Sequence, residues 1–162
     1  MELRDLYTSK RILTGEVIEK GKDVPKGKYY ITVVVFIENS KGEFLLQKRV
    51  HKKDGKWATT GGHPKSGESS LEGIVTEIRE ELGLTVKQNE LTLYKSIQTE
   101  DDFVDLYYMK KDINLGDVKV QKEEVETVKW ASREEITRLI RQGVFSESHE
   151  EFYNYCLEFL DK

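Results

Sequence analysis

Three glutamates near the centre of the chain have the type and spacing of a metal-binding cluster. Glu77, Glu80 and Glu81 fall within five residues in the stretch "GGHPKSGESSLEGIVTEIREELGL", residues 61–84. At 3.6 residues per turn they share an arc about 100° wide, and Glu77 and Glu81 form a repulsive i,i+4 pair. No lysine lies on this arc of the helix. Glutamates on a helix are usually just solvated, but a hard divalent cation would make such crowding favourable, because Mg²⁺ and Mn²⁺ prefer oxygen ligands.

The rest of this stretch predicts a helix that can hold the glutamates in place. Ser69 and Glu72 form an S-x-x-E capping box, and Gly83 is a typical residue to end the helix. A separate apolar stripe, suited to packing on a sheet, consists of Leu71, Ile74, Val75, Ile78 and Leu82. A glycine-rich loop precedes the helix. A cation at this place could neutralise a diphosphate and lower the pKa of an attacking water.

With these residues in view, the chain resembles the Nudix family. The Nudix signature is a glycine, five residues, a glutamate, seven residues, and then Arg-Glu-hydrophobic-x-Glu-Glu-x-Gly-hydrophobic. Residues 62–84 match eight of its nine defined positions, namely Gly62, Glu68, Glu77, Ile78, Glu80, Glu81, Gly83 and Leu84. The segments "GEFLLQKR", "WATTGGHP" and "VETVKWASREEI" resemble flanking parts of Nudix proteins, so that the resemblance covers most of residues 29–142.

The resemblance implies a fold, an activity and a set of site residues. The fold would be α/β, a Nudix-type α/β/α sandwich with a mixed central sheet. The activity would be hydrolysis of a nucleoside diphosphate derivative or related organic pyrophosphate with Mg²⁺ or Mn²⁺. Glu77, Glu80 and Glu81 would be catalytic and would bind the metal, one of them also activating water. Glu68 and the Gly62 carbonyl would support or join the metal site.

Thr76 is the one departure from the signature, which has arginine at this position. An arginine there could pair with Glu72 and Glu80, each one helical turn away, and hold the carboxylates in fixed rotamers. Threonine cannot reach them. Arg79 points about 60° away from position 76 and is a poor substitute. We therefore expect a functional site with slower turnover or a higher metal requirement, and Thr76→Arg tests the orienting role.

Three further residues are candidates for substrate binding. Arg49 ends the segment "FLLQKR" and could contact a phosphate bidentately, although a solvated charge at a strand end is an almost equally good interpretation. Glu124 precedes a predicted strand in a region where many Nudix hydrolases carry an assisting glutamate, and surface solvation is the simpler interpretation. His63 is expected in a loop near the mouth of the site.

Two other functions remain open from the sequence. The first is a Nudix ligand-sensing or binding domain that no longer cleaves, which only Thr76 favours. The second is an enzyme like isopentenyl-diphosphate isomerase, a Nudix relative whose corresponding stretch has a His-Pro pair after a cysteine. This chain has His63-Pro64 but Gly61-Gly62 before it, so it lacks the thiol that isomerisation needs as a proton donor.

Composition sets broader limits. The chain has 162 residues, enough for a single Nudix domain spanning 1–162, and a net charge of −4, which argues weakly against nucleic-acid polymers as partners. A small-molecule diphosphate is the expected partner, and homodimerisation stays open. Cys156 is the only cysteine in the chain, so an internal disulfide is excluded. The charged N-terminus and the lack of long apolar runs favour a cytoplasmic protein without membrane segments.

The elements that must position the site can be expected from periodicity. Strands are predicted within residues 11–20, 29–38, 44–49, 57–62, 91–100, 103–111 and 125–130. Two helices are expected at the end of the chain, with capping boxes at Ser132/Glu135 and Ser148/Glu151. Cys156 lies on the apolar stripe of the last helix, which predicts a packing role for it.

Overall fold

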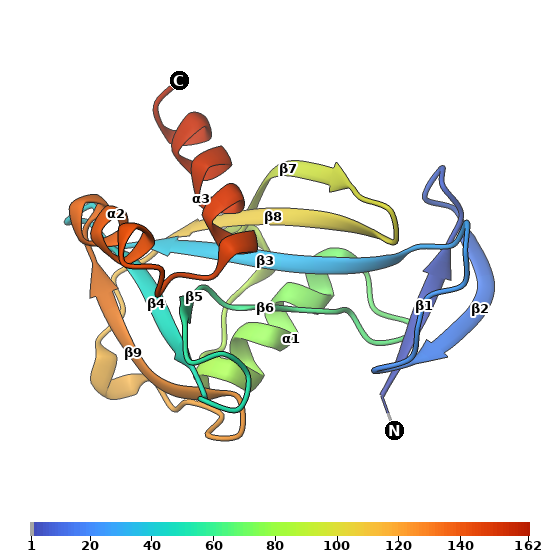
Figure 1. Cartoon of the computed structure of the whole chain (residues 1–162), viewed down its shortest axis with the longest axis horizontal. Helices are drawn as coiled ribbons and strands as arrows, with labels where there is room; N and C mark the ends of the chain where they lie inside the picture. The colour runs from blue at the N-terminus through green and yellow to red at the C-terminus, as the bar shows by residue number, and fades with distance from the viewer. Residues whose placement is uncertain (1) are drawn as a thin grey trace.

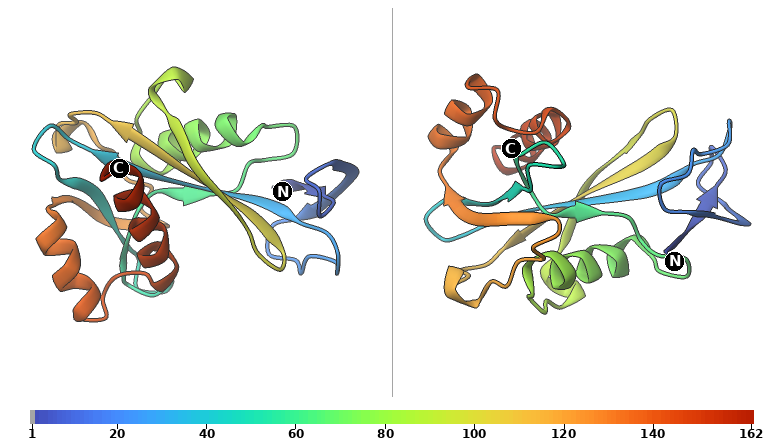
Figure 2. Two further views of the ribbon diagram at one scale, coloured as in Figure 1. Left: turned by 90° about the horizontal axis from the view of Figure 1, so that it is seen from above. Right: turned by 60° about the horizontal axis from the view of Figure 1, so that its bottom comes forward.

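The computed structural model describes residues 2–162 and is built around strand β3 (Tyr30–Glu38), which is buried on both faces. Ile31, Val33, Val35 and Ile37 pack against helix α1 (Ser70–Leu82). Val34 and Phe36 face the other way, toward helices α2 (Arg133–Arg141) and α3 (Glu147–Leu160). This two-sided burial explains the continuous apolar run of the strand. Figure 2 shows the sheet between α1 and the two C-terminal helices, so the predicted α/β/α sandwich is confirmed.

The central sheet is mixed, as predicted. Its strand order is β5-β4-β3-β8-β7, with β6 paired to β3 and β9 paired to β4 (Figure 1). Only β3 and β8 run parallel, and the other pairings are antiparallel. The strands are β4 (Phe44–Arg49), β5 (Trp57–Ala58), β6 (Gly61–Gly62), β7 (Thr92–Gln98), β8 (Asp102–Lys110) and β9 (Val125–Ala131). Two short 3₁₀ helices, Gln88–Glu90 and Leu115–Asp117, lie in the connections.

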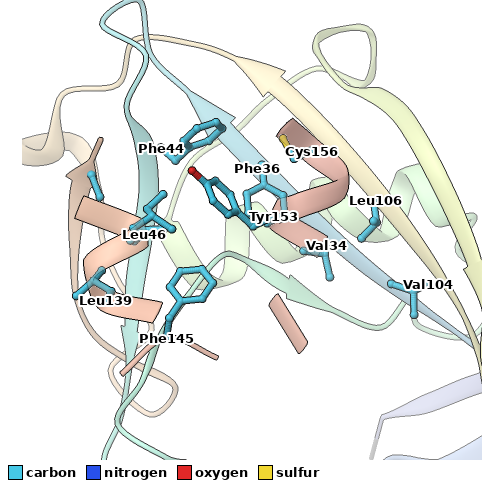
Figure 3. Close-up of a cluster of buried hydrophobic side chains, with 12 residues drawn as sticks. Val34, Phe36, Phe44, Leu46, Val104, Leu106, Leu139, Phe145, Tyr153 and Cys156 are labelled. Atoms are coloured by element: carbon cyan, nitrogen blue, oxygen red, sulfur yellow. The ribbon is translucent and has the colours of Figure 1, made fainter. Parts of the chain in front are cut away.

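The core between the sheet and α3 is rich in aromatic rings. Tyr153 of α3 packs edge-on against Phe44 at 5.7 Å between centroids, and Phe36 lies beside both (Figure 3). Cys156, one turn further along α3, is fully buried in the same cluster. Its predicted packing role is confirmed, and burial raises the pKa of its thiol to about 12.

Of the three predicted capping boxes, the one at α1 is fully formed, the one at α2 is formed in part, and the one at α3 is not formed. At α1 both hydrogen bonds of the Ser69/Glu72 capping box are present, and Gly83 ends the helix in the left-handed region at φ 68°. At α2 Ser132 accepts the Glu135 amide, but the Glu135 carboxylate pairs with Lys129.

The capping box predicted at Ser148 is wrong. Helix α3 begins at Glu147 after Ser146, two residues earlier than expected. The Ser146 amide donates to the carbonyl of Trp57, and its carbonyl accepts the Glu150 amide. Tertiary hydrogen bonding to β5 therefore sets the start of this helix in place of a side-chain cap.

A separate N-terminal hairpin of β1 (Leu3–Tyr7) and β2 (Leu13–Glu19) flanks the sheet (Figure 1). The sequence predicted β2 but not β1, whose charged residues hide its pattern. Reciprocal backbone hydrogen bonds of 2.7 and 2.9 Å join Tyr7 to Tyr29. Among residues 2–162, no helix combines the length and apolarity needed to cross a bilayer.

The hairpin is fastened to the sheet through a buried carboxylate. Arg11, at the hairpin turn with φ 62°, donates two hydrogen bonds to Asp105 of β8, whose side chain is 1 % exposed. The hydroxyls of Ser70 and Ser96 donate to the same carboxylate, at 2.5 and 2.7 Å. One buried charge thus joins the hairpin, the first turn of α1 and strand β7.

Removing the arginine should weaken this junction. We expect Arg11→Ala to lower the free energy of unfolding by about 1–3 kcal/mol, because Asp105 stays buried without its cationic partner. Urea denaturation of the variant and the parent measures the difference. Lys10→Ala is the matched control, since Lys10 is exposed in the same turn. Equal stability of the two variants would contradict a structural role for the pair.

Candidate active site

A cleft of about 520 Å³ brings most of the predicted site residues together. Its walls come from β3, β4, β6, α1, the start of α3 and the N-terminal hairpin. The predicted residues that line it are Arg49, Gly62, His63, Glu77, Glu80, Glu81 and Glu124. Glu68, also predicted, does not line this cleft. A polar cavity with several acidic groups in one wall is a candidate site for a cationic cofactor and its substrate.

Glu77 is the most confined of the three glutamates. Glu77 is 9 % exposed, and its carboxylate lies against Gly62. A Cβ atom on residue 62 would collide with this carboxylate. A glycine is therefore required for this close approach. Burial, and then the charges of Glu81 and Glu80, raise the pKa of Glu77 to about 8. No donor in residues 2–162 forms a hydrogen bond with this carboxylate to offset the burial.

Glu81 lies one turn further along α1 and is held by the sheet. Its Oε1 accepts a hydrogen bond of 2.9 Å from the Gln47 amide, and the Gln47 carbonyl accepts one of 2.8 Å from Thr60. Burial raises the pKa of Glu81 to about 7, against the lowering effect of Gln47 and of the Gly61 backbone. Gln47 thus fixes the rotamer of a carboxylate in the cleft. Gln47 was not predicted as a site residue, and its only sequence signal is that it is a polar residue directly after three apolar ones in β4.

Glu80 has a partner that the helical wheel could not reveal. Lys65, in the loop before α1, forms an ion pair of 2.5 Å with Glu80, which is 37 % exposed. In this arrangement no three acidic, histidine or cysteine side chains of residues 2–162 already converge as a metal cluster. Two buried, proton-retaining carboxylates beside open polar space still fit a divalent cation, because its charge would offset both their desolvation and their repulsion. Glu80 can join them once it leaves Lys65.

Thr76, the departure from the signature, has a role that the sequence analysis missed. It bonds neither Glu72 nor Glu80, as expected from its length. Its hydroxyl instead donates a hydrogen bond of 2.7 Å to Glu68 of the glycine-rich loop, whose other oxygen accepts the Lys65 amide at 2.7 Å. Thr76 is 8 % exposed, so this bond is shielded. It ties the loop to α1 behind the glutamates.

Arg49 and Glu124 lie in the wall on the β4 side of the cleft. Arg49 donates to Asp54 at 3.0 Å and lies 3.5 Å from Nε2 of His149. Glu124 forms an ion pair with Lys53, which also lines the cleft. Both predicted residues are therefore placed to face a ligand, with the arginine already oriented by its neighbours.

His149 was not predicted and is a structural wall of the cleft. Its Nδ1 accepts hydrogen bonds from the Thr59 amide and hydroxyl, at 3.2 and 3.0 Å. Burial, and then the charge of Arg49, lower the pKa of His149 to about 3, so that the ring is neutral. Because Nδ1 accepts from Thr59, the proton of the neutral ring lies on Nε2. The ring anchors the start of α3 against Thr59, which follows β5. A lone histidine in a helix gives no sequence signal for this.

His63 is neutral as well. Burial and the charge of Arg4 lower its pKa to about 4. Its Nδ1 lies 3.3 Å from the Thr32 hydroxyl and 3.2 Å from the carbonyl of Ile31. The histidine thus lines the cleft through its ring, edge-on to Tyr30.

Comparison with known proteins decides the family. The NUDIX domain model matches residues 28–156. The chain belongs to the Nudix family. A Nudix hydrolase of Listeria monocytogenes is 33 % identical over 150 residues, covering 90 % of this chain and 88 % of the relative. This Nudix protein is therefore placed with hydrolases, a family of enzymes that generally cleave pyrophosphates and use divalent metal ions.

The chain is also similar to an isomerase in sequence and to a solved structure in fold. Isopentenyl-diphosphate Delta-isomerase of Pectobacterium atrosepticum is 29 % identical over 129 residues, which are 75 % of this Nudix chain and 72 % of the isomerase. A Deinococcus radiodurans protein of known crystal structure has the same fold, with a TM-score of 0.76 at 19 % identity, covering 94 % of this chain and 98 % of the other.

Removing the Thr76 hydroxyl should loosen the loop of the Nudix box. We expect Thr76→Val to weaken Mn²⁺ binding about 10-fold, the size typical of partners that orient metal ligands. Titration of Mn²⁺ into the folded protein, followed by calorimetry, measures it. Thr76→Ser keeps the donor and is the control. If valine and serine variants bind Mn²⁺ equally, the hydrogen bond to Glu68 has no such role.

The raised pKa of Glu77 predicts a pH-dependent stability in the metal-free protein. Between pH 5 and pH 8 the folded state holds a proton that the unfolded chain has released, so Glu77 destabilises the folded state increasingly as the pH rises. Glu77→Gln removes the penalty. Its stability relative to the parent should rise by about 1 kcal/mol or more over this range, as measured by urea denaturation in EDTA. A difference that is constant with pH would disprove the raised pKa.

Proposed function

We propose that this protein is a Mg²⁺- or Mn²⁺-dependent hydrolase that cleaves the diphosphate linkage of a nucleoside diphosphate derivative or a related organic pyrophosphate. The observation that carries the proposal is the pair of carboxylates with raised pKa values, the buried Glu77 and the half-buried Glu81, in one wall of a cleft that also contains Arg49. Keeping two carboxylates away from water without an ion pair costs stability when they are charged, and this cost is understandable if the cleft takes a cation and an anionic substrate.

The residues of the cleft would have different roles in such a reaction. Arg49 would bind phosphate oxygens and stabilise charge that develops on them. A carboxylate oxygen of the Glu77, Glu80 and Glu81 group would accept the proton of the attacking water as its oxygen bonds to phosphorus and the bridging P–O bond breaks. A bound divalent cation would supply charge neutralisation and a more acidic water. Gln47 keeps Glu81 oriented, and Thr76 keeps Glu68 in place.

The isomerase alternative is weaker because of where the only thiol lies. The Pectobacterium relative supports it, but Gly61 and Gly62 occupy the strand before His63, and Cys156 is in the core on α3 and not in the cleft. No cysteine is therefore available as proton donor. A prenyl diphosphate remains among the organic pyrophosphates to be tested as a hydrolase substrate.

The non-catalytic alternative loses its main support. Thr76 was the feature that favoured a degenerate site, and in the structure its hydroxyl holds Glu68. The three glutamates are also retained at a cost in repulsion. A module that only senses a ligand would gain nothing from keeping them.

A substrate panel with carboxylate variants tests the proposal. Purified protein with Mg²⁺ is incubated with nucleoside diphosphate derivatives, dinucleotides, nucleoside triphosphates and prenyl diphosphates, and released phosphate or nucleoside monophosphate is measured. We expect Glu80→Gln and Glu81→Gln each to lower turnover at least ~100-fold, because each loses a charge that holds the cation, and EDTA to abolish it.

Glu134→Gln is the matched control, since Glu134 is exposed at the start of α2. It should leave turnover unchanged. Full turnover in both the Glu80 and the Glu81 variants would refute the catalytic assignment.

A further inference from the structure

The end of the cleft formed by the N-terminal hairpin contains an arginine whose Nε has no hydrogen-bond partner among residues 2–162. Arg4 of β1 lines the cleft, and its guanidinium lies over the Tyr30 ring, 5.3 Å from the centroid. Its Nε is buried, and within residues 2–162 it meets no hydrogen-bond acceptor. Leaving such a donor unsatisfied costs free energy. A half-buried arginine with an unsatisfied Nε in a binding cleft therefore indicates that a ligand supplies the missing acceptor.

One acidic group in this part of the wall is already satisfied by hydroxyls. Asp102 accepts hydrogen bonds from Thr32, at 2.7 Å, and from Thr99. His63 also lies in this wall, with its Nδ1 3.3 Å from the Thr32 hydroxyl. Lys20, which follows β2, also lines this end. Two cationic side chains are thus available to a ligand, Arg4 and Lys20, with Glu2 as the opposing charge in the cleft wall.

The neighbours of Arg4 and Arg49 indicate that the two arginines lie on opposite sides of the carboxylates. His63 is beside Arg4 and adjoins Gly62, against which Glu77 packs. On the other side, Glu81 bonds Gln47, two residues before Arg49 in β4. A diphosphate centred at the glutamates could reach Arg49 with one end, so that Arg4 would face the substituent on the other.

We propose that Arg4, assisted by Lys20, binds a second anionic group of the substrate, a phosphate that is not part of the bond being cleaved. The planar guanidinium suits phosphate oxygens, and a cation–π contact with Tyr30 helps to hold it in the cleft. This inference rests on the proposed function and narrows it to phosphate-rich substrates. The phosphate could be carried by a sugar or terminate a phosphate chain, and the experiment separates these two sources.

Matched substrates test the subsite kinetically. NADP⁺ and NAD⁺ differ by a sugar phosphate, and ATP and ADP differ by a chain-terminal phosphate. We expect the parent to prefer the phosphate-rich member of one pair in kcat/KM, and Arg4→Ala to lose about 10-fold on that member only. Arg4→Lys keeps the charge and should lose less. A loss that is equal for both members of each pair, or absent from both, overturns the proposal.

Binding without turnover separates this inference from the proposed function. Tripolyphosphate is titrated in EDTA into the parent, Arg4→Ala and the control Arg138→Ala, an exposed arginine of α2. We expect about a 10-fold weaker affinity for Arg4→Ala alone. Unchanged affinity refutes the subsite even if the enzyme hydrolyses diphosphates. If Arg4→Ala lowers only the melting temperature, Arg4 merely holds the hairpin, and the proposal is wrong. A protein that binds tripolyphosphate through Arg4 but cleaves nothing would refute only the hydrolase.

Discussion

Keeping Glu77 and Glu81 close together and largely away from water costs free energy, and the packing of the helix on the sheet must offset this cost. Their shared wall is made possible by Gly62, which leaves room for one carboxylate, and by Gln47, which binds the other. Both positions belong to the sheet, whereas the glutamates belong to α1. The helix must therefore pack on the sheet in one register, and its apolar stripe on β3 fixes that register. Core packing and site chemistry are, in this protein, one constraint on one helix.

The sequence predicted those parts whose signals are local. The periodicity of α1, its capping box and the apolar run of β3 lie within short windows, and the Nudix box places its glutamates by spacing alone. The start of α3 could not be predicted, because a hydrogen bond to Trp57, distant in the chain, determines it. The ion pair of Lys65 with Glu80 and the anchoring by His149 were missed for the same reason.

Thr76 shows how a departure from a family signature can be misjudged from sequence. An arginine at this position is expected to act along the helix, so its absence suggests loosely held carboxylates. The threonine acts across to the loop, where its hydroxyl meets Glu68. The position supports the same group of acids through a different neighbour. A substitution in a motif is therefore better judged by the contacts of the new side chain than by those of the lost one.

The cleft is built from distant parts of the chain, which bears on how the protein is made. Helix α3 is synthesised after every other wall of the cleft, yet it carries His149 and covers Phe36, Phe44 and Leu46. Until α3 leaves the ribosome, one face of the nascent sheet exposes aromatic and aliphatic side chains to water or to chaperones. Once the final helix is translated, that face should become buried and the wall of the cleft should be completed. An unfinished chain is therefore prone to aggregation before it can bind a ligand.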